Sequence, residues 1–179
     1  HAVDEAPDNK GIGFHIHDRC EVFLFVSGNA QYLVEGSVYP LKKGSLLIMR
    51  PNEAHCTRLL NTERYERYAI NFPTSLFDRI DPERRLLKPF TDRPLGHQNH
   101  YYIPGIEDTL YELAYFEGDE YSRTLLFTTK LAWLMDKLGK QGADNFTAEP
   151  TFSERMVRYV NEMLCEEITQ LLADNDNAN

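Results

Sequence analysis

The segment HIHDRCEVFLFVSG, residues 15–28, places two histidines and a carboxylate directly before an apolar run. In an extended strand, side chains two residues apart point the same way, so His15 and His17 present their imidazoles to one side. A short turn is enough to bring Glu21 back to that side. Converging imidazole and carboxylate groups are ligands of divalent metal ions, and His55 offers a fourth such group. The segment therefore predicts either a metal site or a polar wall of a ligand pocket.

Short apolar segments separated by turn signals continue as far as Phe72. The turns recur about every eight to twelve residues, with Val, Phe, Tyr and Leu between them, which is typical of an antiparallel sandwich or barrel. Such intervals leave no room for helical crossovers between parallel strands. We expect strands near residues 22–26, 30–35, 46–49 and 65–72. The first half of the chain is thus predicted to be mainly β.

Helical periodicity replaces this alternation at residues 106–116 and 119–140. The longer segment carries an apolar stripe at intervals of three and four residues. Its members are Phe127, Leu131, Leu134 and Leu138. The stripe either covers the sheet of its own chain or packs against a second copy across a two-fold axis, which makes these residues the dimerisation candidates.

Changes in composition divide the chain into five parts. They are an irregular arm at residues 1–13, a barrel core at 14–73, a helical part with the dimerisation helix at 74–142, a linker at 143–152, and the start of a further helical domain at 153–179. The last part opens at Ser153, which is a good helix-capping residue ahead of an apolar face.

Bulk composition restricts the function classes. A chain of 179 residues that is 42% hydrophobic and 26% charged fits one domain with its own core. No apolar run is long enough to span a bilayer, so we expect no membrane partner. The formal charge of −9 disfavours binding of nucleic-acid phosphates by this part of the protein.

Other patterns bear on compartment and chemistry. Three cysteines without a C-x-x-C pair fit free thiols in the cytoplasm. The chain begins at His1 without a leader pattern, so we expect it to be a piece of a longer protein. It has no Ser-His-Asp arrangement, phosphate-cradling loop or dinucleotide fingerprint, which argues against the commonest enzyme classes.

Two motifs resemble those of the cupin superfamily. The first is H-x-H-x-x-x-E followed after six residues by glycine, from His15 to Gly28. The second runs from Gly44 through Pro51 to His55, but Glu53 stands about where a glycine is expected and the proline-to-histidine spacing is one residue short. The resemblance implies a small antiparallel β-barrel or jelly roll followed here by helices. In metal-binding cupins the three histidines and the glutamate of these motifs are the ligands.

A longer stretch of the sequence, from about residue 14 to 140, resembles the effector-binding and dimerisation domain of AraC-type transcription regulators. The segments that carry this resemblance are His15 to Glu21, Tyr32 to Gly36, Tyr39 to Leu41, Arg50 to His55 and Tyr65 to Phe72. Residues 156–179 resemble the opening of the DNA-binding domain of that family, which contains helix-turn-helix units. The resemblance implies a barrel that binds a small effector, often sugar-like, helices that form a homodimer, and DNA contact only through the part that is missing here.

The sequence therefore gives two functional hypotheses. The first is a non-enzymatic effector sensor that needs no cofactor, whose pocket candidates are His15, His17, Glu21, Phe23, Phe25, Arg50 and His55. The second is a metal-dependent cupin enzyme, an isomerase or oxygenase, in which His15, His17, Glu21 and His55 hold Zn, Ni or Fe. Phe23 and Phe25 also fit a plain hydrophobic core, and Arg67 is either buried and paired or simply exposed.

Overall fold

The structure is a computed structural model that describes residues 1–8, 13–143, 155–157, 159–161, 163–164 and 167. Nearly all of the expected linker at 143–152, the capping residue Ser153 and most of the segment 153–179 lie outside these residues. Within the described part, no helix is both long enough and apolar enough to cross a membrane.

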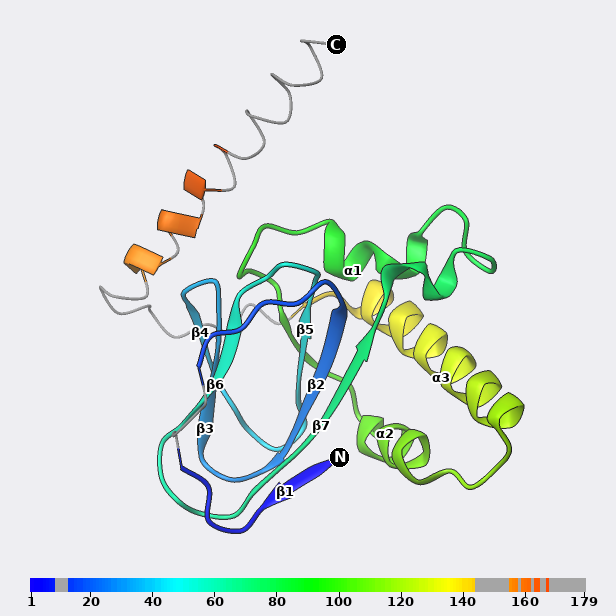
Figure 1. The fold of residues 1–179 in the computed structure, drawn as a ribbon, viewed down its shortest axis with the longest axis horizontal. Coiled ribbons are helices and arrows are strands. Elements are labelled where there is room, and N and C mark those ends of the chain that lie inside the picture. Colours follow the sequence, from blue (N-terminus) through cyan, green and yellow to red (C-terminus); the bar gives the residue numbers. More distant parts are fainter. Residues whose placement is uncertain (9–12, 144–154, 158, 162, 165–166, 168–179) are drawn as a thin grey trace.

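Two antiparallel sheets form the core of the molecule (Figure 1). The larger sheet has the order β1-β7-β2-β5-β8, with strands Ala2–Asp4, Tyr65–Phe72, Cys20–Ser27, Ser45–Met49 and His100–Tyr102. The smaller sheet has the order β4-β3-β6, with strands Ser37–Pro40, Ala30–Val34 and His55–Leu59. This arrangement confirms the predicted cupin-like antiparallel fold.

Strand β2 explains why the segment after Glu21 is apolar on both faces. Phe23 and Phe25 point into the core between the sheets, where they meet Tyr32 of the smaller sheet. The alternate residues, such as Val22 and Leu24, belong to a second core on the outer face of the larger sheet. A strand buried on both sides needs apolar residues at every position.

The turn between β3 and β4 fixes the register of the smaller sheet. Its two central residues, Glu35 and Gly36, have positive φ values of 49° and 80°, as a type I′ hairpin turn requires. Val34 consequently pairs with Ser37. Glu35 also receives a 2.6 Å hydrogen bond from the side chain of Asn161, which lies in the described part of the C-terminal segment (Figure 1).

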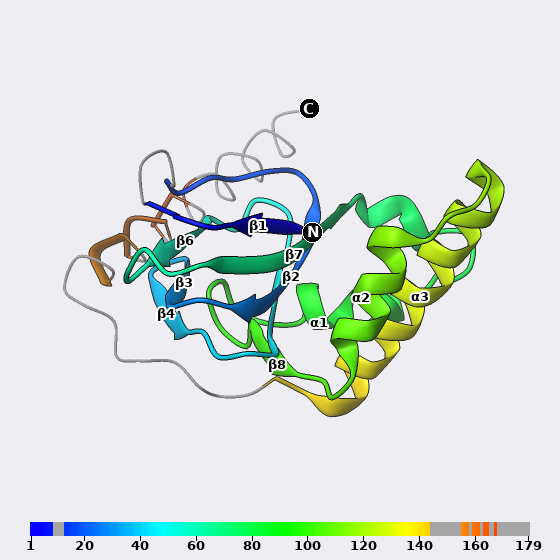
Figure 2. The same ribbon diagram turned by 90° about the horizontal axis from the view of Figure 1, so that it is seen from below.

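Helices cover the outer face of the larger sheet (Figure 2). They are α2 (Ile106–Tyr115) and α3 (Glu120–Gln141), together with the short α1 (Lys88–Thr91) and the 3-10 turns η1 (Thr74–Phe77) and η2 (Arg85–Leu87). The Asp119 side chain caps α3 by accepting a 2.7 Å hydrogen bond from the Ser122 amide. The two long helices begin and end within about one residue of the sequence prediction.

The apolar stripe of α3 packs on its own chain. Leu131, Leu134 and Leu138 are at most 1% exposed within the outer core, and Phe127 packs against that core. The stripe is therefore not an exposed surface for a second chain in this arrangement. Its role in dimerisation stays a prediction. The large apolar side chains that α3 leaves exposed are Tyr121, Leu125 and Trp133.

A buried ion pair joins the loops at one end of the barrel. Glu53 and Arg93 are 0% and 6% exposed, and two guanidinium nitrogens of Arg93 each donate to one carboxylate oxygen of Glu53 at 2.7 Å. The same carboxylate accepts hydrogen bonds from the amides of Gly96 and Arg50 and from the Asn99 side chain. Burial alone raises the pKa of Glu53, but these contacts outweigh it and lower the pKa.

We expect Arg93→Met to destabilise the fold by about 3–5 kcal/mol, because it leaves a buried carboxylate without its partner. Chemical denaturation measures this change. Arg85→Met is the matched control, since Arg85 pairs with Glu83 in an exposed position and its loss has a small effect. Equal destabilisation by the two variants would contradict the assigned importance of the buried pair.

The same pair predicts a dependence of stability on pH. The folded pKa of Glu53 lies below its ordinary value of 4.5, so its stabilisation is complete above that pH and is lost as the pH falls through the lowered folded value. The difference in free energy of unfolding between the wild type and Glu53→Gln should therefore be largest near neutrality and shrink in acid. Denaturant titrations of both proteins from pH 7 to pH 3 measure it, and a gap that stays constant would show the prediction to be wrong.

Candidate functional site

Backbone pairing brings the four predicted polar residues together. His15 and His55 form an isolated antiparallel bridge with two 3.1 Å backbone hydrogen bonds. The amide of Asn52 donates to the carbonyl of His17, so the segment before β2 lies along the loop that leads into β6. Glu21 is the second residue of β2. One potential ligand atom from each of His15, His17, Glu21 and His55 lies within 4.8 Å of all the others. We call these residues the His/Glu cluster.

Backbone carbonyls orient all three imidazoles of the cluster. The Nδ1 atoms of His15, His17 and His55 lie 3.3, 2.9 and 2.6 Å from the carbonyl oxygens of residues 13, 19 and 53, respectively. A carbonyl only accepts, so each Nδ1 is the donor. In the neutral rings each Nε2 is therefore an unprotonated acceptor, the form in which histidine binds metal.

Glu21 lies opposite two of these Nε2 atoms. Its Oε2 is 3.0 Å from Nε2 of His17 and 3.5 Å from Nε2 of His55, while its Oε1 accepts a 3.1 Å hydrogen bond from the Tyr32 hydroxyl. Burial raises the pKa of Glu21, but its contacts with His55, His17 and Tyr32 outweigh this effect and lower the pKa to about 2. Burial lowers the pKa of His55, yet the neighbouring Glu21 and the Glu53 carbonyl raise it overall.

This geometry fits a divalent cation. An unprotonated Nε2 that faces a carboxylate oxygen needs a proton or a cation between the two acceptors. The Nε2 of His55 is buried and has no hydrogen-bond partner among the described residues. Three Nε2 atoms and one carboxylate oxygen, with each ring held by a carbonyl behind it, form the donor set expected for Zn, Ni or Fe. The cluster can therefore hold a metal ion or, without one, a protonated imidazole.

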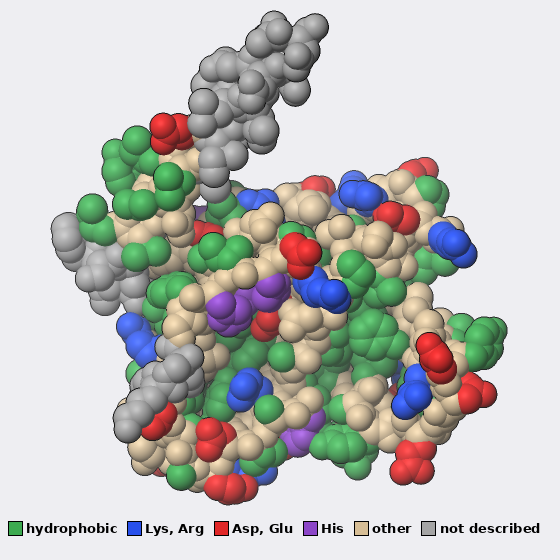
Figure 3. All heavy atoms as spheres, in the orientation of Figure 1, with side chains coloured by type: hydrophobic (Ala, Val, Ile, Leu, Met, Phe, Trp, Pro, Cys, Tyr) green, Lys and Arg blue, Asp and Glu red, His purple; other side chains and the backbone are tan. Residues whose placement is uncertain are grey.

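A cavity of about 470 Å³ opens beside the cluster, between the two sheets. Residues of three kinds line it: cluster members, aromatic and polar residues of the barrel, and residues of the N-terminal arm. They include His15 and Glu21, then Phe23, Tyr32, Thr57, Tyr65 and Arg67, and from the arm Asp4, Pro7, Asp8 and Gly13. Histidine side chains gather at the surface of the barrel in Figure 3.

The structure separates the predicted pocket residues into groups. His15, Glu21 and Phe23 line the cavity, while His17 and His55 belong to the cluster beside it. Phe25 lies in the core between the sheets, with its ring centroid 6.0 Å from that of Tyr65. This position matches the alternative in which Phe25 is a hydrophobic core residue and not a pocket residue.

Arg50, which the sequence places among the pocket candidates, does not line this cavity. The chain leaves strand β5 at Met49, and the Arg50 side chain turns to the loop, where it donates to the Arg93 carbonyl at 3.3 Å. The arginine that lines the cavity is Arg67. The alternation of β7 could have located it, because Tyr65, Arg67 and Ala69 share one face of the strand.

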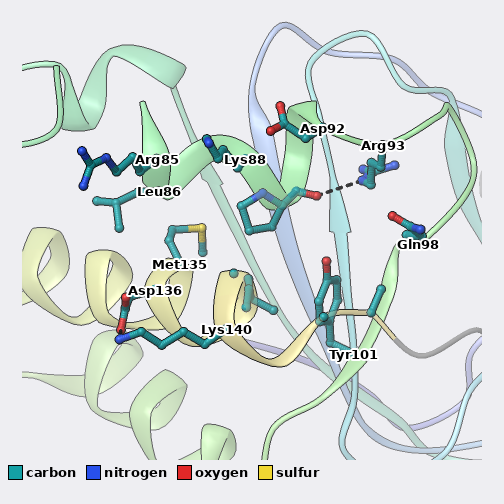
Figure 4. Close-up of a pocket in the computed structure, with 15 residues that line it drawn as sticks. Arg85, Leu86, Lys88, Asp92, Arg93, Gln98, Tyr101, Met135, Asp136 and Lys140 are labelled. Atoms are coloured by element: carbon teal, nitrogen blue, oxygen red, sulfur yellow. Dashed lines mark hydrogen bonds and ion pairs between the residues drawn. The ribbon is translucent and has the colours of Figure 1, made fainter. Parts of the chain in front are cut away.

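A second cavity of about 370 Å³ lies between the α1 region and the C-terminal end of α3 (Figure 4). None of the predicted pocket residues lines it. Its lysine at position 140 is paired with Asp136 at 2.7 Å, and its Arg93 donates to the Pro89 carbonyl. The cavity between the sheets is therefore the better candidate site.

Among solved structures, one with a TM-score above 0.5 supports the fold. ToxT from Vibrio cholerae matches with a TM-score of 0.52 at 14% identity, over 82% of this chain and 58% of that protein. AerE from Microcystis aeruginosa matches with a TM-score of 0.35 at 14% identity, over 38% of this chain and 32% of that protein. A salicylate 1,2-dioxygenase from Pseudoaminobacter salicylatoxidans has a TM-score of 0.35 at 13% identity, over 63% of this chain and 39% of that protein. The chain thus spans only part of each of these proteins.

A search of curated proteins finds no significant match. The family of AraC-like ligand-binding domains, in contrast, matches residues 3–100, which is more than half of the sequence. The fold, the cavity between the sheets and this match lead to one conclusion: the chain belongs to the AraC-like ligand-binding domain family.

Proposed function

We propose that this chain is the effector-sensing and dimerising part of an AraC-type transcription regulator. The observation that carries the proposal is the cavity of about 470 Å³ between the sheets of a domain from a ligand-binding family. This volume is in the range of small-molecule sites. The role is one of binding and needs no catalysis.

The lining suits a hydroxyl-rich, sugar-like metabolite. Phe23, Tyr32 and Tyr65 offer aromatic surfaces, against which the apolar faces of a sugar ring pack. The carboxylate of Glu21 accepts hydrogen bonds, and the hydroxyl of Thr57 both donates and accepts them. A few converging polar groups on aromatic walls can fix the orientation of such a ligand.

The N-terminal arm gives the effector a way to change the arrangement of the protein. Asp4 and Asp8 of the arm line the same cavity as the barrel residues. A ligand in the cavity contacts both parts and therefore favours the arrangement in which the arm lies over the barrel. Such a difference in affinity between two arrangements is what allosteric control requires.

DNA binding and dimerisation belong to the complete regulator in this proposal. The match covers 58% of the length of ToxT. In this proposal, residues 153–179 are the start of a cytoplasmic helix-turn-helix domain that continues beyond Asn179. A homodimer forms through the helical part, for which α3 offers the exposed side chains of Tyr121, Leu125 and Trp133. Translating the native reading frame beyond Asn179 tests this part of the proposal.

A screen of sugars, sugar acids and phenolic metabolites at millimolar concentration tests the sensor function. We expect at least one compound to raise the melting temperature, because a ligand that binds only the folded state stabilises it. Ala69→Phe at the cavity wall should abolish the rise by filling the space. Ala114→Phe, at an exposed position of α2 outside the cavity, is the matched control. If the ligand still raises the melting temperature of Ala69→Phe, it binds at another site.

A second candidate function is favoured by the orientation of the His/Glu cluster. Potential ligand atoms of His15, His17, Glu21 and His55 lie within 4.8 Å of one another and are suited to hold Zn, Ni or Fe. A bound ion would supply a Lewis acid beside the cavity, and with an open coordination position the protein would be a metal-dependent cupin enzyme, an isomerase or oxygenase.

Calorimetric titration of the metal-free protein with Zn²⁺ or Ni²⁺ tests this cluster. We expect one ion per chain, with an affinity that falls as the pH is lowered because protons compete for the imidazoles. His17→Gln should weaken binding strongly, whereas His97→Gln, outside the cluster, should not. Equal binding by both variants would place the ion elsewhere, and turnover by the loaded protein would favour the enzyme over the sensor.

A further inference from the structure

We propose that the effector carries a single carboxylate and that Arg67 binds it. This inference rests on the proposed sensor function and specifies the ligand class as a sugar acid. It is carried by the position of one arginine in the cavity wall and by the charges around it.

Arg67 is held rigidly inside the larger sheet. It lies in the middle of β7, where its backbone pairs with Ala2 of β1 on one side and Phe25 of β2 on the other. Its guanidinium carbon lies 5.0 Å from the centre of the Tyr65 ring, and both residues line the cavity. A strand with neighbours on both sides and a cation–π contact fix the place of the charge.

Arg67 has no carboxylate partner among the described residues. The buried Arg93 is fully engaged by Glu53, and the exposed Arg64 pairs with Glu66. A half-buried guanidinium without an anion has lost part of its hydration and gained no charged partner in return. A ligand carboxylate can satisfy it with two parallel hydrogen bonds.

The acidic residues that line the cavity are Glu21 and two aspartates of the exposed N-terminal arm. Glu21 accepts hydrogen bonds from Tyr32 and faces His17, so its charge is compensated locally. Asp4 and Asp8 come from the exposed arm, and Asp4 accepts from the Ala6 amide. Two arm carboxylates oppose the entry of a phosphate dianion more strongly than that of a monoanion. The charges therefore favour one carboxylate on an otherwise neutral, hydroxyl-rich molecule.

Matched acid and neutral ligands test this inference. The pairs are D-galacturonate with D-galactose and D-gluconate with D-sorbitol, titrated calorimetrically into the 179-residue chain. We expect a sugar acid to bind about tenfold or more tightly than its neutral counterpart, as a charged pair of hydrogen bonds allows. Arg67→Gln should remove this preference, and Arg67→Lys, which keeps the charge without the planar fork, should retain part of it.

Arg64→Gln is the control, because Arg64 directly precedes strand β7, is exposed and does not line the cavity. Circular dichroism and the melting temperature without ligand show whether each variant folds. An acid preference that survives Arg67→Gln, or equal affinity for acid and neutral ligands, overturns the inference but leaves the sensor function standing. If no member of either pair binds, the sugar-acid assignment falls. If no compound of the wider metabolite screen raises the melting temperature either, the proposed sensor function is also wrong.

Discussion

The buried pair of Glu53 and Arg93 is the interaction on which the arrangement of the site depends. Its carboxylate gathers hydrogen bonds from the loop after β5, from the Arg93 side chain and from the segment that leads into β8. Arg93 and Asn99 also donate to the carbonyl of Ile48 in the central part of the sheet. One carboxylate thus ties the loop after β5 to the segment from Arg93 to Asn99, where no regular strand pairing holds them.

The same pair positions the polar cluster through the main chain. The carbonyl of Glu53 accepts the Nδ1 proton of His55, and the amide of the next residue, Ala54, donates to Glu35 in the β3–β4 turn. Glu53 occupies the position at which the cupin motif favours glycine. The departure does not remove His55 from the cluster, because the carboxylate points away into the loops while the carbonyl orients the imidazole.

Placement of charge separates the structural groups from the functional ones. Glu53 and Arg93 neutralise each other away from solvent, and such a pair specifies a loop conformation more than it adds net stability. Glu21 and the histidines lie next to the cavity, where a ligand, a proton or a metal ion can share their lone pairs. Arg67 lines the same cavity and has no ion-pair partner in the described part of the chain, which is the basis for proposing that it binds a ligand carboxylate.

The sequence by itself determined the features that depend on local periodicity. Alternation and regular turns gave the antiparallel sheets, helical spacing gave α2 and α3, and the two-residue spacing of His15 and His17 gave the shared direction of their side chains. The tertiary structure alone decided where the Arg50 side chain lies once the chain leaves β5, whether the stripe of α3 meets its own sheet, and what the carboxylate of Glu53 contacts. These outcomes depend on loops that leave the strands and on partners some 40 residues away, as in the pairing of Glu53 with Arg93. Periodicity carries no information about such contacts, because it describes the direction of a side chain only while its strand or helix continues.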